Sequence, residues 1–182
     1  MVRRILHNTL FILADLAGLN ALWRKRNANR IRVLMYHSVT SRPMSAPCWT
    51  VLSAAFFEKH MSHLARYYQC LSATQMLSLL SSDADHIRNG ALITFDDGLK
   101  NNATDVEPIL ARHSLTACCF VCPGLSKSGE MIWADIIWEG IVDGTANQID
   151  LTVVGGEVIA LPLDKHGRAT IAGSIIERMK SI

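Results

Sequence analysis

The chain has 182 residues, of which 49% are hydrophobic and 19% are charged, so it can bury a core and is not a disordered polymer. Its formal net charge of +2 gives no reason to expect nucleic acid as a partner. The five cysteines are an odd number, which favours reduced thiols over a disulfide framework. Thiol usage argues for the cytoplasm, and a cytoplasmic or membrane-associated location is favoured over a secreted one.

The first 23 residues form an apolar-leaning segment that we interpret as an amphipathic helix. Four apolar residues recur in it at helical spacing: Leu6, Leu10, Leu13 and Ala17. Asp15 interrupts the apolar core that a signal peptide or a membrane span requires. The basic cluster Arg24–Arg32 follows. Residues 1–32 could contact a membrane surface, or residues 1–30 could be a packed helix with a solvated basic linker, which is the more ordinary arrangement.

From residue 31 to residue 122 the sequence alternates between strand and helix patterns. Strands are expected at residues 31–37, 68–71, 91–95 and 116–122. The last of these is expected to be buried, so that the thiols of Cys118, Cys119 and Cys122 would be unreactive. Helices are expected at residues 54–67, 72–80 and 101–113, and Pro108 should kink the last helix or start a new turn. Residues 40–50 and 81–90 are typical of loops. This order predicts an α/β fold with a parallel sheet.

The last fifty residues predict a helix, a β-hairpin and a second helix. The first helix, at residues 131–142, contains Trp133 and Trp138, for which core packing is the default. Residues 149–163 favour a hairpin with Gly155-Gly156 in a type I′ turn. A turn at residues 164–167 then leads into a helix at residues 169–180.

The strongest chemical signal is a pair of acids, Asp96 and Asp97, at the end of the third predicted strand. Neighbouring side chains of a strand point to opposite faces, so both carboxylates serve one site only if the backbone turns, which Gly98 permits. Two adjacent carboxylates repel, so one must hold a proton, bind a cation or face water. His37 ends the first strand, and α/β folds place their chemistry at such ends. The alternatives are an ordinary turn and a structural histidine.

These residues resemble a known family. Thr94-Phe95-Asp96-Asp97-Gly98 is similar to the first motif of the NodB-type polysaccharide deacetylases, the family four carbohydrate esterases, and Met35–Ser38 resembles the signature of their first strand. The segment Phe120–Gly124 looks like the one after the next helix. Trp133, the hairpin and the last helix resemble an insertion in one bacterial branch. The resemblance spans residues 31–182 and implies one domain with a distorted (β/α) barrel, of which this chain is a part.

The resemblance also implies hydrolysis of N-acetyl groups on a polysaccharide or oligosaccharide, a carbon–nitrogen bond outside peptides. Asp97 would be a ligand of a divalent metal, commonly zinc, and Asp96 would be the general base. The metal would lower the pKa of bound water, and Asp96 would take its proton as the water attacks the amide carbonyl. His37 would lie beside the metal or the substrate.

The chain departs from this family in its metal ligands. After Asp97 the only histidines are His113 and His166, and no His-x-x-x-His occurs in the sequence. Catalytic zinc takes three protein ligands, and the resemblance supplies one. Four strands are also too few to close a barrel. We therefore expect an amino-terminal fragment of a deacetylase that is inactive, with a non-catalytic carbohydrate-binding or partner-binding remnant as the alternative.

Overall fold

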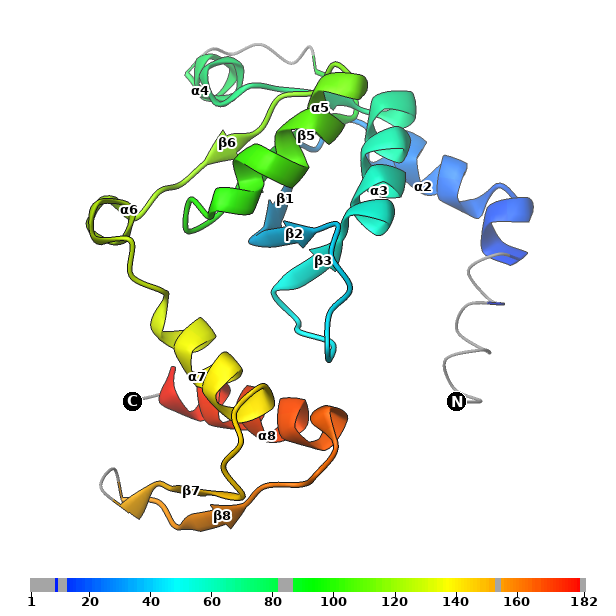
Figure 1. Ribbon diagram of the computed structural model, residues 1–182. Helices are drawn as coiled ribbons and strands as arrows, with labels where there is room; N and C mark the ends of the chain where they lie inside the picture. Colours follow the sequence, from blue (N-terminus) through cyan, green and yellow to red (C-terminus); the bar gives the residue numbers. More distant parts are fainter. Residues whose placement is uncertain (1–8, 10–12, 82–86, 153–154, 181–182) are drawn as a thin grey trace. The chain divides into compact units, whose positions relative to one another are not determined.

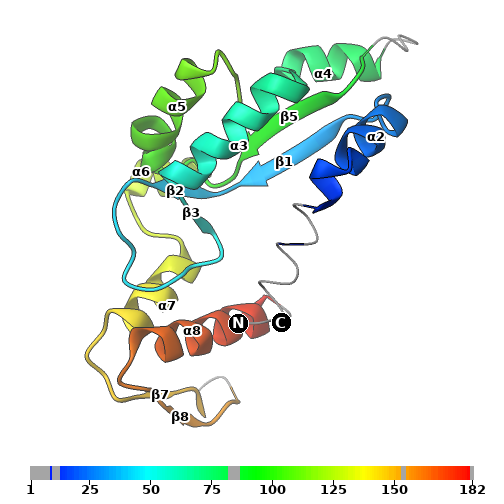
Figure 2. The same cartoon turned by 90° about the vertical axis from the view of Figure 1, so that its right-hand side faces the viewer.

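The computed structural model describes residues 9, 13–81, 87–152 and 155–180 (Figures 1 and 2). Its internal contacts divide the chain into two compact units. The first unit comprises Met1–Met35, Glu58–Thr94 and Ile109–Cys118, and the second comprises Tyr36–Phe57, Phe95–Pro108 and Cys119–Ile182. The sequence-based boundary at residue 30 stays a prediction.

A central sheet contains β1 (Arg32–Tyr36), β4 (Gln69–Cys70), β5 (Gly90–Phe95) and β6 (Cys118–Cys119). The strand order is β1-β5-β4, and β6 also pairs with β5. β4 and β5 are parallel, with Gln69 opposite Gly90. All six residues of β5 are buried, as expected for a strand covered on both faces. The fold is therefore mixed α/β, and the described residues form no closed barrel.

The last two helices before β5 follow the prediction closely. α3 (Ala54–Tyr67) begins after Ser53, whose hydroxyl accepts the Phe56 N–H at 3.4 Å, and it buries Phe57, Met61 and Leu64. α4 (Ala73–Leu80) begins with a capping box in which Ser72 and Gln75 exchange side-chain and backbone hydrogen bonds of 2.8 and 3.2 Å. Local capping signals of this kind fix helix starts in the sequence itself.

The amino-terminal helix differs from its prediction. α2 spans Leu19–Arg26, so Arg24 lies in a helix and not in a linker. Gly18, with φ of 72°, separates α2 from the helical residues 13–16, while Leu6 and Leu10 lie outside the described residues. Arginine and lysine are good helix formers and interact favourably with the carboxyl end of a helix, which explains the extension. Within the described residues, no helix has the length and hydropathy of a membrane span.

The predicted loop at residues 40–50 is bounded by a small sheet. β2 (Ser38–Thr40) pairs in parallel with β3 (Val51–Ser53), with Ser38 opposite Val51. Val39 in this sheet is completely buried. Only residues 41–50 therefore form the connecting loop.

The fourth strand was predicted too long and too buried. β6 has only two residues, and Phe120 and Val121 after it are 58% and 57% exposed. Cys119 is exposed as well, so it is not a buried thiol. Pro123 begins α6 (Pro123–Ser128), because proline suits the first turn of a helix.

Before β6, the helix predicted at residues 101–113 is divided into two elements. A π-helical segment, η1 (Asn102–Val106), leads into α5 (Glu107–Arg112). Pro108 lies in the first turn of α5, so it starts a new helix, which was the second of the two expectations for it.

The carboxyl-terminal elements are α7 (Trp133–Val142), β7 (Gln148–Asp150), β8 (Val158–Ala160) and α8 (Lys165–Met179). The hairpin is confirmed as antiparallel, but Asp150 opposite Val158 leaves seven residues between the strands, so the two-residue type I′ turn is wrong. α8 begins four residues earlier than predicted, because the Asp164 carboxylate accepts the Gly167 N–H at 2.8 Å. Figure 2 shows α7 and α8 side by side.

Candidate functional site

The backbone turns sharply where β5 ends. The Asp96 N–H still donates to the Tyr36 carbonyl at 2.9 Å, which keeps Asp96 beside the end of β1. Asp97 and Gly98 then adopt φ angles of 71° and 67°, both in the left-handed region. The turn expected at Gly98 thus begins at Asp97, a residue type that tolerates this conformation better than most but still with strain.

His37 and Asp96 meet at the ends of β1 and β5. His37 Nε2 lies 3.9 Å from Asp96 Oδ2, and the two side chains are 23% and 31% exposed. This separation is too long for a hydrogen bond and becomes an ion pair when the imidazole is protonated. The His37 ring also packs edge-on against Trp49, with 5.9 Å between ring centroids. The structure therefore brings these predicted site residues together, while their chemical roles stay predictions.

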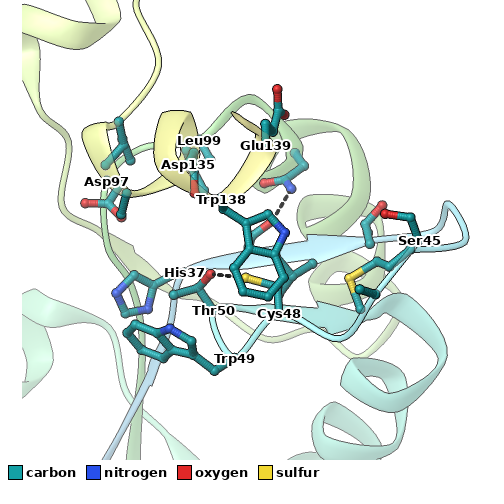
Figure 3. Close-up of a pocket in the computed structure, with 18 of the residues that line it drawn as sticks. His37, Ser45, Cys48, Trp49, Thr50, Asp97, Leu99, Asp135, Trp138 and Glu139 are labelled. Atoms are coloured by element: carbon teal, nitrogen blue, oxygen red, sulfur yellow. Dashed lines mark hydrogen bonds between the residues drawn. The ribbon is translucent and has the colours of Figure 1, made fainter. Parts of the chain in front are cut away.

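A cavity of about 720 Å³ opens beside these strand ends, lined by residues of the second unit. Asp97 and His37 both line it, and Figure 3 shows them on the same side of the cavity. Asp96 contacts the lining residue His37 but does not line the cavity itself. Of the two acids, therefore, only Asp97 lines the cavity.

Three tryptophans also line the cavity: Trp49, Trp133 and Trp138. Trp133 is 44% exposed, so the prediction that it packs in the core is wrong. Trp138 lines the cavity and also packs on the core between α7 and α8. Trp49 lies in the loop before β3, where no periodic pattern marks it. Flat aromatic faces beside polar groups suit a ligand that has both apolar and hydroxyl-bearing surfaces.

Asp135 on α7 is an acidic lining residue that sequence reasoning missed. Burial raises its pKa above the ordinary value for aspartate, and the negative charges of Asp97 and Glu139 act in the same direction, while His37 opposes them. The sequence did hold a signal, since Asp135 and Glu139 are spaced i, i+4 on an otherwise apolar helix.

We expect Asp135→Asn to raise the free energy of unfolding at pH 7 but to change it little near about pH 3. The pKa of Asp135 is raised in the folded state, so its contribution to stability is full below the unfolded pKa and is lost as the pH rises through the folded value. Asparagine cannot ionise and escapes this loss. Urea unfolding at the two pH values measures the difference.

Asp150→Asn is the matched control, because the pKa of Asp150 is shifted in the opposite direction to that of Asp135. Hydrogen bonds from Thr152 lower the pKa of Asp150, so its contribution to stability is present above the unfolded pKa and is lost in acid. Asp150→Asn should therefore lower the free energy of unfolding at pH 7 and leave it unchanged in acid. If both variants shift stability in the same direction at pH 7, the argument from Asp135 is wrong.

The residues around the cavity do not make a complete metal site. Among the residues that the structure describes, no three His, Cys, Asp or Glu side chains lie together so that they could hold a metal ion. His113 contacts Glu58 at 2.5 Å, and His166 lies beside a smaller pocket. These residues therefore do not fit a catalytic zinc with three protein ligands.

Sequence comparison identifies relatives of this chain. No protein-family model matches it. Over 94 residues, the chain is 32% identical to YxkH of Bacillus subtilis (strain 168), which is assigned by name to the polysaccharide deacetylases. The polysaccharide deacetylases are therefore the family that this chain resembles over that stretch. The match covers 50% of this chain and 32% of YxkH, so it spans about a third of that relative.

One solved structure shows a fold similar to that of part of this chain. The Streptococcus pyogenes deacetylase PplD, solved in complex with acetate, has a TM-score of 0.50 and 22% identity, covering 60% of this chain and 50% of PplD. A de-N-acetylase from Aggregatibacter actinomycetemcomitans has a TM-score of 0.45 and 19% identity, covering 82% of this chain and 51% of that one. The predicted resemblance to the polysaccharide deacetylases is confirmed by the sequence match to YxkH.

Proposed function

We propose that the second unit carries the substrate cavity of a polysaccharide deacetylase and binds N-acetylated polysaccharide or oligosaccharide. One observation carries the proposal: a single cavity joins the motif residue Asp97 and His37 to three tryptophans. The relationship to YxkH supports the substrate class, because that protein is assigned to the polysaccharide deacetylases. We also infer that the sheet is part of a distorted (β/α) barrel of the NodB type.

In the proposed reaction, water attacks the carbonyl carbon of an N-acetyl group, the carbon–nitrogen bond breaks as the nitrogen takes up a proton, and the products are acetate and a sugar with a free amino group. Asp96 is the proposed general base that takes the proton of the attacking water; it does not line the cavity but lies 3.9 Å from the lining residue His37. Asp97 would be one ligand of a divalent metal, with zinc as the first candidate, which would supply Lewis acidity. The described residues offer no complete ligand set, so we expect this chain alone to release no acetate.

The second candidate function is carbohydrate binding without catalysis. It is favoured by the incomplete ligand set among the described residues and by the missing His-x-x-x-His motif. The cavity and its tryptophans are common to both candidates, so binding alone does not separate them. Acetate release does.

We expect an N-acetylglucosamine pentamer to bind the full chain and to change its tryptophan fluorescence, because three of its four tryptophans line the cavity. Trp49→Ala should weaken binding about tenfold, the usual value of one lost aromatic contact. Trp49 is 58% exposed, so this change should leave the fold intact. Trp23→Ala is the control, since Trp23 is equally exposed but does not line the cavity.

Acetate release by the same samples, with and without added zinc, tests the catalytic part. No release together with binding supports a binding function for this chain. Zinc-dependent release that Asp96→Asn abolishes would support catalysis and disprove the expected inactivity. If the pentamer does not bind, or if Trp23→Ala weakens binding as much as Trp49→Ala, the cavity is not the carbohydrate site.

A further inference from the structure

Positive charge is concentrated at the amino-terminal end of the chain. Residues 1–57 contain eight arginines and lysines and one acid, Asp15, whereas residues 58–182 contain ten basic and fifteen acidic residues. From Leu16 to Phe57 there is no aspartate or glutamate. The nearly neutral total therefore hides a basic segment and an acidic remainder, and the basic segment suits an anionic partner.

In the first unit, part of α2 is held in place by aromatic contacts. The Arg24 guanidinium lies 4.3 Å from the centre of the Tyr67 ring. The Arg32 guanidinium lies 5.2 Å from the centre of the Trp23 ring and 5.0 Å from that of Tyr68. These cation–π contacts position the helix, and they engage the positive charges of Arg24 and Arg32.

Leucines and cations are among the exposed side chains of this segment. Leu16, Leu19 and Leu22 are 81%, 54% and 62% exposed, although leucine usually gains by burial. Lys25, Arg26 and Arg30 are exposed as well. Leu19, Leu22 and Arg26 recur at i, i+3 and i+7, which is one stripe of a helix. We call the six residues the α2 surface: Leu16, Leu19, Leu22, Lys25, Arg26 and Arg30.

We propose that the α2 surface docks on a lipid bilayer that carries anionic head groups. Exposed leucines enter the boundary between head groups and acyl chains, while flanking lysines and arginines pair with the head-group charges. Nucleic acid would use the positive charges but not the leucines. This proposal is independent of the proposed function, because none of the six residues lines the cavity.

Co-sedimentation of the full chain with vesicles tests it. We expect binding to vesicles of phosphatidylcholine with one third phosphatidylglycerol, and little binding to phosphatidylcholine alone. Lys25→Gln/Arg26→Gln/Arg30→Gln should weaken binding about 100-fold, since each cation near an anionic surface contributes about 1 kcal/mol, or about fivefold. The matched control is Lys59→Gln/Lys100→Gln/Lys127→Gln, which removes three exposed cations elsewhere.

A second pair of variants tests the leucines. Leu19→Ser/Leu22→Ser should weaken binding to the mixed vesicles at least tenfold. Leu77→Ser/Leu80→Ser is its control, because these leucines are 66% and 69% exposed at the same i, i+3 spacing on α4. Circular dichroism checks that all variants are folded.

Three results would overturn the proposal. Equal binding to neutral and anionic vesicles would remove the role of the cations. If a control variant weakens binding as much as the matching variant of the α2 surface, the contact with the vesicle is not made by the α2 surface. Binding of a short DNA duplex that needs the three cations but tolerates the two serines, without vesicle binding, would assign the surface to nucleic acid.

Discussion

Replacing Arg168 by methionine is expected to lower the free energy of unfolding by about 3–5 kcal/mol. Arg168 is only 6% exposed although it carries a charge. Its guanidinium donates hydrogen bonds of 2.8–3.0 Å to the carbonyls of Ile141, Gly144, Ala146 and Pro162. Methionine fills a similar volume but leaves these carbonyls without their donors, and each unsatisfied buried group is destabilising. Urea unfolding followed by far-ultraviolet circular dichroism measures the loss.

Two variants separate the role of the hydrogen bonds from that of the helix. Arg168→Lys keeps the charge but cannot reach four carbonyls from one ammonium group, so it should recover less than half of the loss. Arg178→Met changes an exposed arginine of the same helix and should lower the free energy of unfolding much less than Arg168→Met does. An Arg168→Met chain as stable as Arg178→Met would show that water replaces the guanidinium.

The sequence predicts those parts of the fold that local chemistry decides. The capping box of Ser72 and Gln75 marks the start of α4, and the apolar stripe of Phe57, Met61 and Leu64 defines α3. The continuous apolar run of β5 was likewise assigned correctly, since every residue in it is buried. In each of these elements the signal and the structure depend on residues close together in the sequence.

Elements that depend on distant contacts were predicted less well. The run at residues 116–122 is as apolar as β5, yet only Cys118 and Cys119 form the strand β6. Burial needs a covering layer, and apolar composition alone does not show whether one exists. Arg168 is the converse case, because a buried arginine has no sequence signature when its guanidinium donates to backbone carbonyls, which every residue type supplies.

The candidate site was predictable in outline only. The proximity of His37 and Asp96 follows from strand order, because the ends of neighbouring parallel strands meet at one edge of a sheet. Trp49 and Asp135 could not be placed in the same way, since a loop and a later helix bring them to the cavity. The roles of Asp96 as base and of Asp97 as metal ligand stay predictions.

Replacing Gly98 by alanine is expected to lower the free energy of unfolding by about 3 kcal/mol, from two separate causes. Gly98 has a φ of 67°, where a side chain is strained by about 1–2 kcal/mol. A Cβ atom there would also lie 2.7 Å from Val121 Cγ1 and 3.2 Å from Val121 Cα. Backbone crowding is not relieved by a rotamer change, so either the turn after Asp97 or the segment after β6 must move. Urea unfolding measures the loss of stability.

Gly129→Ala separates the two causes, because Gly129 has nearly the same φ of 73° but no atom of the described residues lies within 4 Å of the point that its Cβ would occupy. It should therefore show the dihedral strain alone, about 1–2 kcal/mol, and the excess at Gly98 measures the crowding against Val121. Because the turn carries Asp97 into the cavity, Gly98→Ala should also weaken pentamer binding, whereas Gly129→Ala should not. Equal losses of stability in the two variants would mean that Val121 yields freely and that the backbone at Asp97 is not held by this contact.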